Sequence, residues 1–216
     1  MICDIHNVLS KNLFTLLQEQ QIKFMKYFTN NAARIFLFMS ILLSSALSHS
    51  QTWRQLGIDL DGEASIDYSG FSVSTSADGL TVAIGAPYND ENGSDSGHVR
   101  IYSYVNNSWQ QLGADIDGEA AGDYSGESVS LSSDGTIVAI GAIYNDVNRL
   151  DSGHVRIYNF VNNSWQQLGA DIYGEAATDS SGYPVSLSSD GSIVAIGAIY
   201  NDENGLDSGH VRIIVM

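Results

Sequence analysis

The sequence predicts an all-β protein: a partial β-propeller of about three four-stranded blades, preceded by an N-terminal apolar signal helix. Three observations support this prediction. Most of the chain is one 56-residue unit written nearly three times, as the spacing of Trp53, Trp109 and Trp165 shows. Each unit contains short runs of alternating apolar residues joined by turn residues, which is typical of strands. After residue 50, no stretch keeps the 3.6-residue apolar period of a helix.

Residues 1–50 are expected to be a leader that is not part of the repeat. Lys26 and Arg34 precede an apolar run at residues 35–47 that ends in small residues, which is the layout of a secretory signal peptide. The run is about 13 residues long, whereas a bilayer span needs about 20, so an uncleaved membrane anchor is the weaker alternative. Met25 would make a more ordinary start, because it shortens the mixed segment ahead of the basic flank.

Charge separates at the same boundary. The leader holds four basic and two acidic residues, and the remainder holds five basic and 23 acidic residues with no Lys and no Cys. An acidic, Lys-free surface argues against a nucleic-acid partner, since phosphates need a basic footprint. It suits binding of multivalent cations or simple solubility. Without Cys, the exported part has no disulfides, thiolate metal sites or Cys nucleophiles.

The middle unit predicts four strands, at residues 127–132, 136–142, 154–161 and 164–172. The first two should form a hairpin, because Asp134-Gly135 between them supplies the positive φ of a tight turn. The second strand is apolar on both faces, as expected of a strand covered on both sides. One four-stranded sheet cannot bury both its faces, so we expect the units to stack as propeller blades. Stacked sandwiches and a solenoid are the alternatives.

The repeated motifs also resemble a known family. VAIGA at residues 82–86 and GHVRIY at 97–102, which recur in the later units, are similar to the FG-GAP repeats of integrin-α-like propellers, in a variety abundant in exported flavobacterial proteins. The resemblance covers about residues 53–213. It implies a propeller, usually of seven blades, in secreted or surface proteins, and a role in adhesion.

Residues 51–216 form the predicted repeat domain, with units starting near 53, 109 and 165. The last unit leaves the pattern at Ile214, so a truncated gene product, or a fragment that assembles with other copies, is expected. Three blades would leave open edges that favour self-association.

The loop after each VAIGA motif is the first candidate metal site. Carboxylate and amide oxygens recur there at near-alternate positions, and hard oxygen donors on a flexible loop suit Ca²⁺. The predicted ligands are Asp90, Asn92, Asp95, Asp146, Asn148, Asp151, Asp202, Asn204 and Asp207. The same residue types form turns, so the alternative is a loop held by its own hydrogen bonds.

The second candidate Ca²⁺ site consists of Asp115, Asp117, Glu119 and Asp123. Their spacing is similar to that of the calcium loops of integrin-α propellers. Two departures weaken the resemblance: the Gly stands at relative position 4 instead of 6, and the family's loop lies inside a hairpin that is very short here. A solvated acidic loop is the alternative.

Two other residue types recur once in each unit. Because the repeat symmetry keeps His98, His154 and His210 apart, we expect them to make structural hydrogen bonds and not to share a metal. The three Trp residues are expected to pack between blades, not to form a carbohydrate platform.

No catalytic motif is present: there is no GxSxG, HExxH or phosphate-binding loop. Acidic pairs recur in every unit, whereas a catalytic pair normally occurs once. We therefore predict a secreted or cell-surface module without catalytic activity that binds an extracellular protein or glycan, with Ca²⁺ as the one cofactor that its loops favour. It would contact a membrane only through an uncleaved leader. The alternatives are a propeller enzyme acting on extracellular polysaccharide and a non-functional fragment of a longer propeller protein.

Overall fold

The computed structural model describes residues 15–23, 25–27 and 53–216. The chain divides into two units, Met1–Arg54 and Gln55–Met216. In the first unit, the described residues are helical up to residue 27. The predicted apolar run, and with it the signal peptide, lies outside the described residues, so the leader and the start at Met25 stay predictions. No helix in the described part of the chain is long and apolar enough to cross a membrane.

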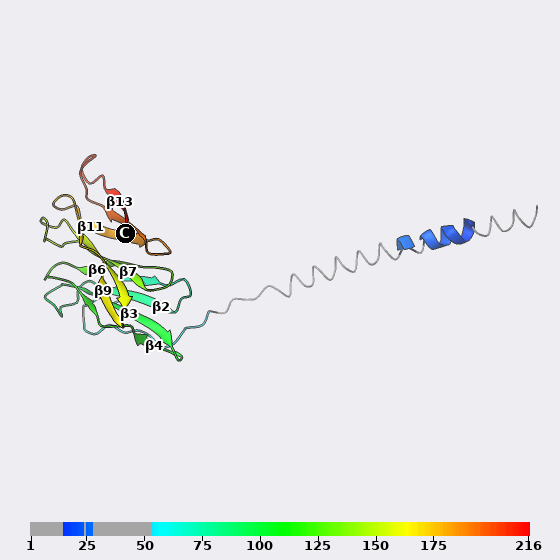
Figure 1. The fold of residues 1–216 in the computed structure, drawn as a ribbon, viewed down its shortest axis with the longest axis horizontal. Helices are drawn as coiled ribbons and strands as arrows, with labels where there is room; N and C mark the ends of the chain where they lie inside the picture. The colour runs from blue at the N-terminus through cyan, green and yellow to red at the C-terminus, as the bar shows by residue number, and fades with distance from the viewer. Residues whose placement is uncertain (1–14, 24, 28–52) are drawn as a thin grey trace, which may run out of the picture. The chain divides into compact units, whose positions relative to one another are not determined.

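The unit Gln55–Met216 is all-β, as predicted, and its strands form three antiparallel sheets that we call the first, second and third blades (Figure 1). The first blade contains β1 (Ser72–Thr75), β2 (Thr81–Ala86), β3 (His98–Val105), β4 (Ser108–Gln111) and β5 (Ile116–Asp117). The second blade contains β6 (Ser125–Leu131), β7 (Ile137–Ala142), β8 (His154–Val161), β9 (Ser164–Gln167) and β10 (Ile172–Tyr173). The third blade contains β11 (Ser181–Leu187), β12 (Ile193–Ala198) and β13 (His210–Val215).

The predicted hairpin turn at Asp134-Gly135 is confirmed. Gly135 has a φ of 72°, in the left-handed region that glycine adopts at little cost. One carboxylate oxygen of Asp134 accepts hydrogen bonds from Ser132 Oγ (2.6 Å) and from the backbone N–H of Thr136 (3.0 Å). The turn therefore joins β6 to β7, which pair antiparallel from Ser125 to Leu131.

The prediction of one continuous outer strand at 164–172 is wrong. The outer edge of β8 pairs with two short strands, β9 at one end and β10 at the other. Between them the chain turns at Gly169, whose φ is 78°, and the first blade breaks in the same way at Gly113 (φ 81°). The positive φ of this glycine ends the extended conformation, so the four-residue strand and the two-residue strand are separate elements.

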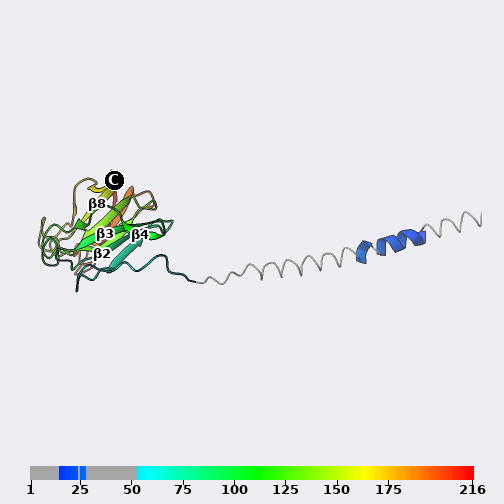
Figure 2. The ribbon, with the colours of Figure 1, turned by 90° about the horizontal axis from the view of Figure 1, so that it is seen from below.

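The core lies between the blades. A first core cluster joins one face of the first blade, with Val99 and Ile101, to the facing strands of the second blade, with Val129 and Ile140. A second core cluster joins the other face of the second blade to β11 and β12 in the same way. Each blade thus buries its face against the next one (Figures 1 and 2), which is the arrangement expected of neighbouring propeller blades.

Candidate functional site

The loops after β2, β7 and β12 hold the first set of predicted ligands. Asp90 Oδ1 accepts a hydrogen bond from the backbone N–H of Asp95 (2.8 Å), and the amide of Asn92 donates to the backbone oxygen of Gly118 (2.6 Å). The later units repeat the first of these bonds, from Asp151 to Asp146 (2.6 Å) and from Asp207 to Asp202 (2.7 Å). Asn148 repeats the second, to Gly174 O (2.9 Å).

These bonds are the turn chemistry that was the alternative to calcium. In the described residues, several groups of His, Asp and Glu atoms lie within 4.8 Å of one another, and none of these groups includes an Asp of the three loops. Calcium binding by Asp90, Asp146, Asp202 and their neighbours stays a prediction.

The second predicted set is distributed over separate surroundings. Asp115 lies beside His98, and Glu119 lies beside His154 of the next blade. Asp123 is buried and accepts a hydrogen bond from the amide of Asn145 (2.9 Å). Asp117 lies in β5, where burial raises the pKa of its carboxyl group and the nearby Asp115 raises it further. The contacts therefore divide these four acids between two His residues, a buried amide and the edge of a sheet.

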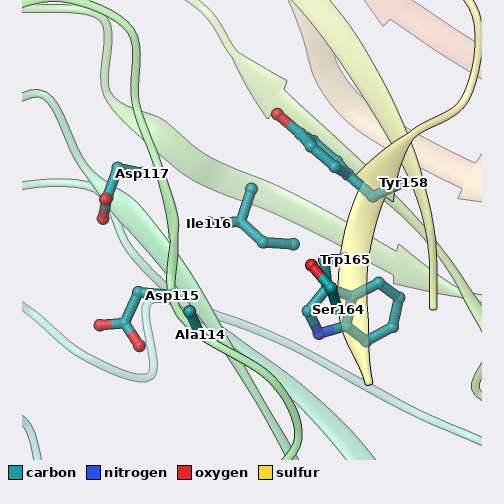
Figure 3. A pocket seen from close by; sticks show the side chains of 7 residues that line it. All are labelled: Ala114, Asp115, Ile116, Asp117, Tyr158, Ser164 and Trp165. Carbon is teal, nitrogen blue, oxygen red and sulfur yellow. The ribbon is translucent and has the colours of Figure 1, made fainter. Parts of the chain in front are cut away.

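A pocket of about 200 Å³ lies next to Asp115 and Asp117. In Figure 3 the side chain of Ile116 points toward the rings of Tyr158 and Trp165, and both carboxylates point away from Trp165. The indole N–H of Trp165 donates to the backbone oxygen of Leu112 (2.7 Å), and the ring packs against the first core cluster. The described contacts of Trp165 thus join the second blade to the end of the first.

The structure brings acids and His residues together in three groups that were not predicted from the sequence. In the first blade, Glu63, Glu91, His98 and Asp115 bring their ligand atoms within 4.8 Å of one another. We call these four residues the first cluster. The second cluster is Glu119, His154 and Asp171, and the third is Glu175, Glu203 and His210. The sequence-based expectation concerned distances between the three His residues, and it did not consider the acids that lie beside each His. The relevant signal was the spacing around the first two His residues: an acid lies 35 residues before each of them, and another lies 17 residues after it, in the next unit.

In the first cluster, His98 faces two carboxylates. Its Nδ1 lies 3.6 Å from Asp115 Oδ2 and 3.9 Å from Glu63 Oε2. The other oxygen of Glu63, Oε1, lies 3.1 Å from Nη1 of Arg100, and the amide of Gln111 donates to Oδ1 of Asp115. Each carboxylate therefore has one oxygen held by a neighbour and one directed toward the imidazole.

The second cluster has looser geometry. His154 Nδ1 lies 3.8 Å from Glu119 Oε2 and 4.0 Å from Asp171 Oδ2, and the latter oxygen already accepts a hydrogen bond from Tyr173 (2.9 Å). The pKa of His154 is lowered to about 4. Burial is the main cause, the charge of Arg156 also lowers the pKa, and the smaller effect of Asp171 raises it. The imidazole of His154 is therefore neutral at pH 7.

A family model described as FG-GAP repeat matches residues 58–102 and 114–158. Each matched segment contains the first two strands of a blade, the first five residues of the third strand and the acidic segment before them. A search of curated proteins finds no match. Among solved structures, the chain is similar to a crystal structure of a candidate 6-phosphogluconolactonase from Bacteroides uniformis, with 16% sequence identity and a TM-score of 0.39. That similarity covers 67% of this chain and 40% of that protein, and at this level it carries no argument about function.

Proposed function

We propose that this chain, an FG-GAP repeat protein, is a secreted or cell-surface binding module that assembles blade to blade with a second copy of itself. FG-GAP repeats are propeller blades and are typical of extracellular or surface proteins, which supports the proposed location. The ligand class that we expect is an extracellular protein or glycan. The module has no catalytic activity of its own in this proposal, because its acidic groups recur from blade to blade instead of occurring once.

One observation carries the proposal: the same residues are buried in two blades and exposed in the third. Val99 and Val155 are 0% exposed, because the next blade covers them, whereas the equivalent Val211 on β13 is 65% exposed. Ile213, also on β13, is 71% exposed. The third blade thus presents the apolar face that the other two blades use for stacking.

The first blade presents the complementary face. Val129 and Val185, on the strands that cover the preceding blade, are 9% and 8% exposed, whereas the equivalent Val73 on β1 is 63% exposed. A second copy could therefore dock its β1 face on β13 with the same side chains that meet inside one chain. Docking of a patch on a different patch of an identical molecule is a head-to-tail interface, which closes into a ring when the rotation allows.

The polar contacts at the seams support the same docking. The backbone N–H of Leu131 donates to Ser74 Oγ (2.9 Å), and that of Leu187 donates to Ser130 Oγ (2.9 Å). On the open face of the third blade, the equivalent acceptor is the Oγ of Ser186. On the open face of the first blade, the equivalent donor is the backbone N–H of Thr75.

Sedimentation analysis of the full chain tests the proposal. We expect a two-copy assembly at micromolar concentration, and we expect the exposed substitution Val211→Asp to abolish it, because it places a charge in the apolar seam. Val105→Asp is the matched control, since Val105 is also an exposed strand valine but lies on neither open face. A wild-type chain that stays monomeric while fully folded would refute the assembly.

Calcium dependence is the second part of the proposed function. It is supported by the exposed carboxylates of the loops after β2, β7 and β12. Thermal unfolding of the full chain in Ca²⁺ and in chelator tests it, because a ligand that binds only the folded state must raise the melting temperature. An unchanged melting temperature would leave these loops as turns.

A further inference from the structure

We propose that the first cluster, Glu63, Glu91, His98 and Asp115, is a binding site for a divalent transition-metal ion of the Zn²⁺ type. This inference does not depend on assembly of the blades or on calcium binding by the loops. Of the four residues, only Asp115 is among the calcium ligands predicted from the sequence.

The first argument is an unpartnered buried nitrogen. The side chain of His98 is 1% exposed, and its Nδ1 has no hydrogen-bond partner. Buried polar groups are almost always paired, because an unpaired one loses its hydration without compensation. Here the nitrogen is directed at carboxylate oxygens that are 3.6 and 3.9 Å away, too far for a direct hydrogen bond.

The second argument is that these distances suit an ion between the groups. Zn²⁺ binds imidazole nitrogen and carboxylate oxygen at about 2.0–2.2 Å, so two ligand atoms of a tetrahedral site lie about 3.4 Å apart. The separations from His98 Nδ1 are close to that value. Small movements of Glu63 and Asp115, both partly exposed, would complete the geometry.

The third argument is that neighbouring side chains already orient the ligands. Arg100 holds one oxygen of Glu63, and Gln111 holds one oxygen of Asp115, which leaves the second oxygen of each directed at the imidazole. Outer contacts of this kind orient the carboxylates and His residues of metal sites. Glu91 is placed by its own loop, since its backbone N–H donates to Oδ1 of the buried Asn89 (2.9 Å).

The charge and donor types select the ion. Three carboxylates and the guanidinium of Arg100 leave two net negative charges, which one divalent cation neutralises. An imidazole donor favours Zn²⁺ and related transition metals, whereas Ca²⁺ and Mg²⁺ prefer oxygen alone. The partial exposure of Glu63 gives an ion access from solvent.

The second cluster lacks one donor and serves as an internal comparison. Val147 stands where the first cluster has Glu91, and it follows the same loop contact, from its backbone N–H to Asn145 Oδ1 (3.1 Å). In addition, Tyr173 occupies the Asp171 oxygen nearest to the imidazole of His154. We therefore expect the first cluster to bind the ion more tightly than the second.

The experiment is a titration of the metal-free full chain with Zn²⁺ alone, with Glu91→Gln as the main variant. Glu91 is exposed, so its replacement leaves the packing intact, and we expect the dissociation constant for Zn²⁺ to rise about tenfold or more. Asp59→Asn is the matched control, because Asp59 is an exposed acid outside the three clusters. We expect it to leave the affinity unchanged.

Two further measurements place the ion. Val147→Glu supplies the missing donor, so we expect it to raise the Zn²⁺ affinity of the second cluster, although Tyr173 still occupies one Asp171 oxygen there. In nuclear magnetic resonance spectra, Zn²⁺ should shift the imidazole nitrogen signals of His98, and excess Ca²⁺ should not. Equal Zn²⁺ affinity in wild type and Glu91→Gln, or an unchanged His98 signal, would overturn the proposal, and neither result would bear on self-association.

Discussion

Gly113 marks the point where the outer strand of the first blade breaks, and it fits there for two reasons. Its φ of 81° disfavours any side chain, and a Cβ at this position would lie 2.9 Å from Cδ1 of Trp165 on the next blade. We predict that Gly113→Ala lowers the free energy of unfolding by about 2–4 kcal/mol, from backbone strain and displacement of the indole together. Denaturant unfolding measures this.

Gly169 offers a matched control for that substitution. It has the same place in the second blade and a φ of 78°, yet nothing lies within 4 Å of its Cβ position. Gly169→Ala should therefore cost only the backbone strain, about 1 kcal/mol. Equal losses for the two variants would mean that the contact with Trp165 contributes nothing.

The turn aspartates give the protein an acid-sensitive contribution to stability. Hydrogen bonds from Ser188 and Ser192 lower the pKa of Asp190 to about 2, and those from Ser132 and Thr136 lower the pKa of Asp134. A carboxylate whose pKa is lower in the folded chain stabilises it fully above the unfolded value near 4, and this contribution is lost as the pH falls toward the folded pKa.

We therefore predict that Asp190→Asn destabilises the protein at pH 6 and that the difference from wild type shrinks between pH 4 and pH 2. Melting temperatures measured across this range test the prediction. The exposed Asp59, for which no turn contact of this kind is seen, should show no such trend on replacement by Asn. A difference that stays constant with pH would contradict the role of the Asp190 carboxylate.

At the scale of the loop elements, a buried side-chain pair fixes each loop to its blade. Asn145 and Asp123 are both buried, and the Asn amide donates to the carboxylate at 2.9 Å. Asn145→Ala would leave the carboxylate with one fewer donor, so we predict a loss of about 2–3 kcal/mol in the free energy of unfolding. Asn148→Ala, which removes a bond at the loop surface, should cost about 1 kcal/mol or less. Chemical denaturation of the two variants gives the comparison.

The elements show which features the sequence could predict. Asp134-Gly135 and the apolar run after it give local signals, so the hairpin of β6 and β7 was predicted, and β8 was predicted with the bounds that it has. The break between β9 and β10 was missed, because the signal is one Gly inside a strand-like run and its cause, a left-handed φ, is not visible in composition. The clusters were missed for another reason: Glu63, His98 and Asp115 meet only after the chain has folded back across the outer edge of β3.

For the whole molecule, unequal burial of the blades predicts unequal local stability. In β8 the first five residues are buried, whereas in β13 alternate residues face solvent. We predict faster amide hydrogen exchange in β13 than at the equivalent positions of β8, because local opening exposes less apolar surface there. Exchange measured by mass spectrometry tests this, and raising the protein concentration should slow exchange in β13 if a second copy covers it. Equal protection of the two strands would contradict the prediction.

The two seams use the same contacts. The hydroxyl of Ser72 donates to the backbone oxygen of Gly126, and that of Ser128 donates to the backbone oxygen of Gly182. A gene that gained or lost one whole unit by unequal recombination would therefore encode a protein in which each pair of neighbouring blades still meets through these same contacts. Such length variants should fold without compensating mutations, which gives this repeat a simple route to evolving proteins with different numbers of blades.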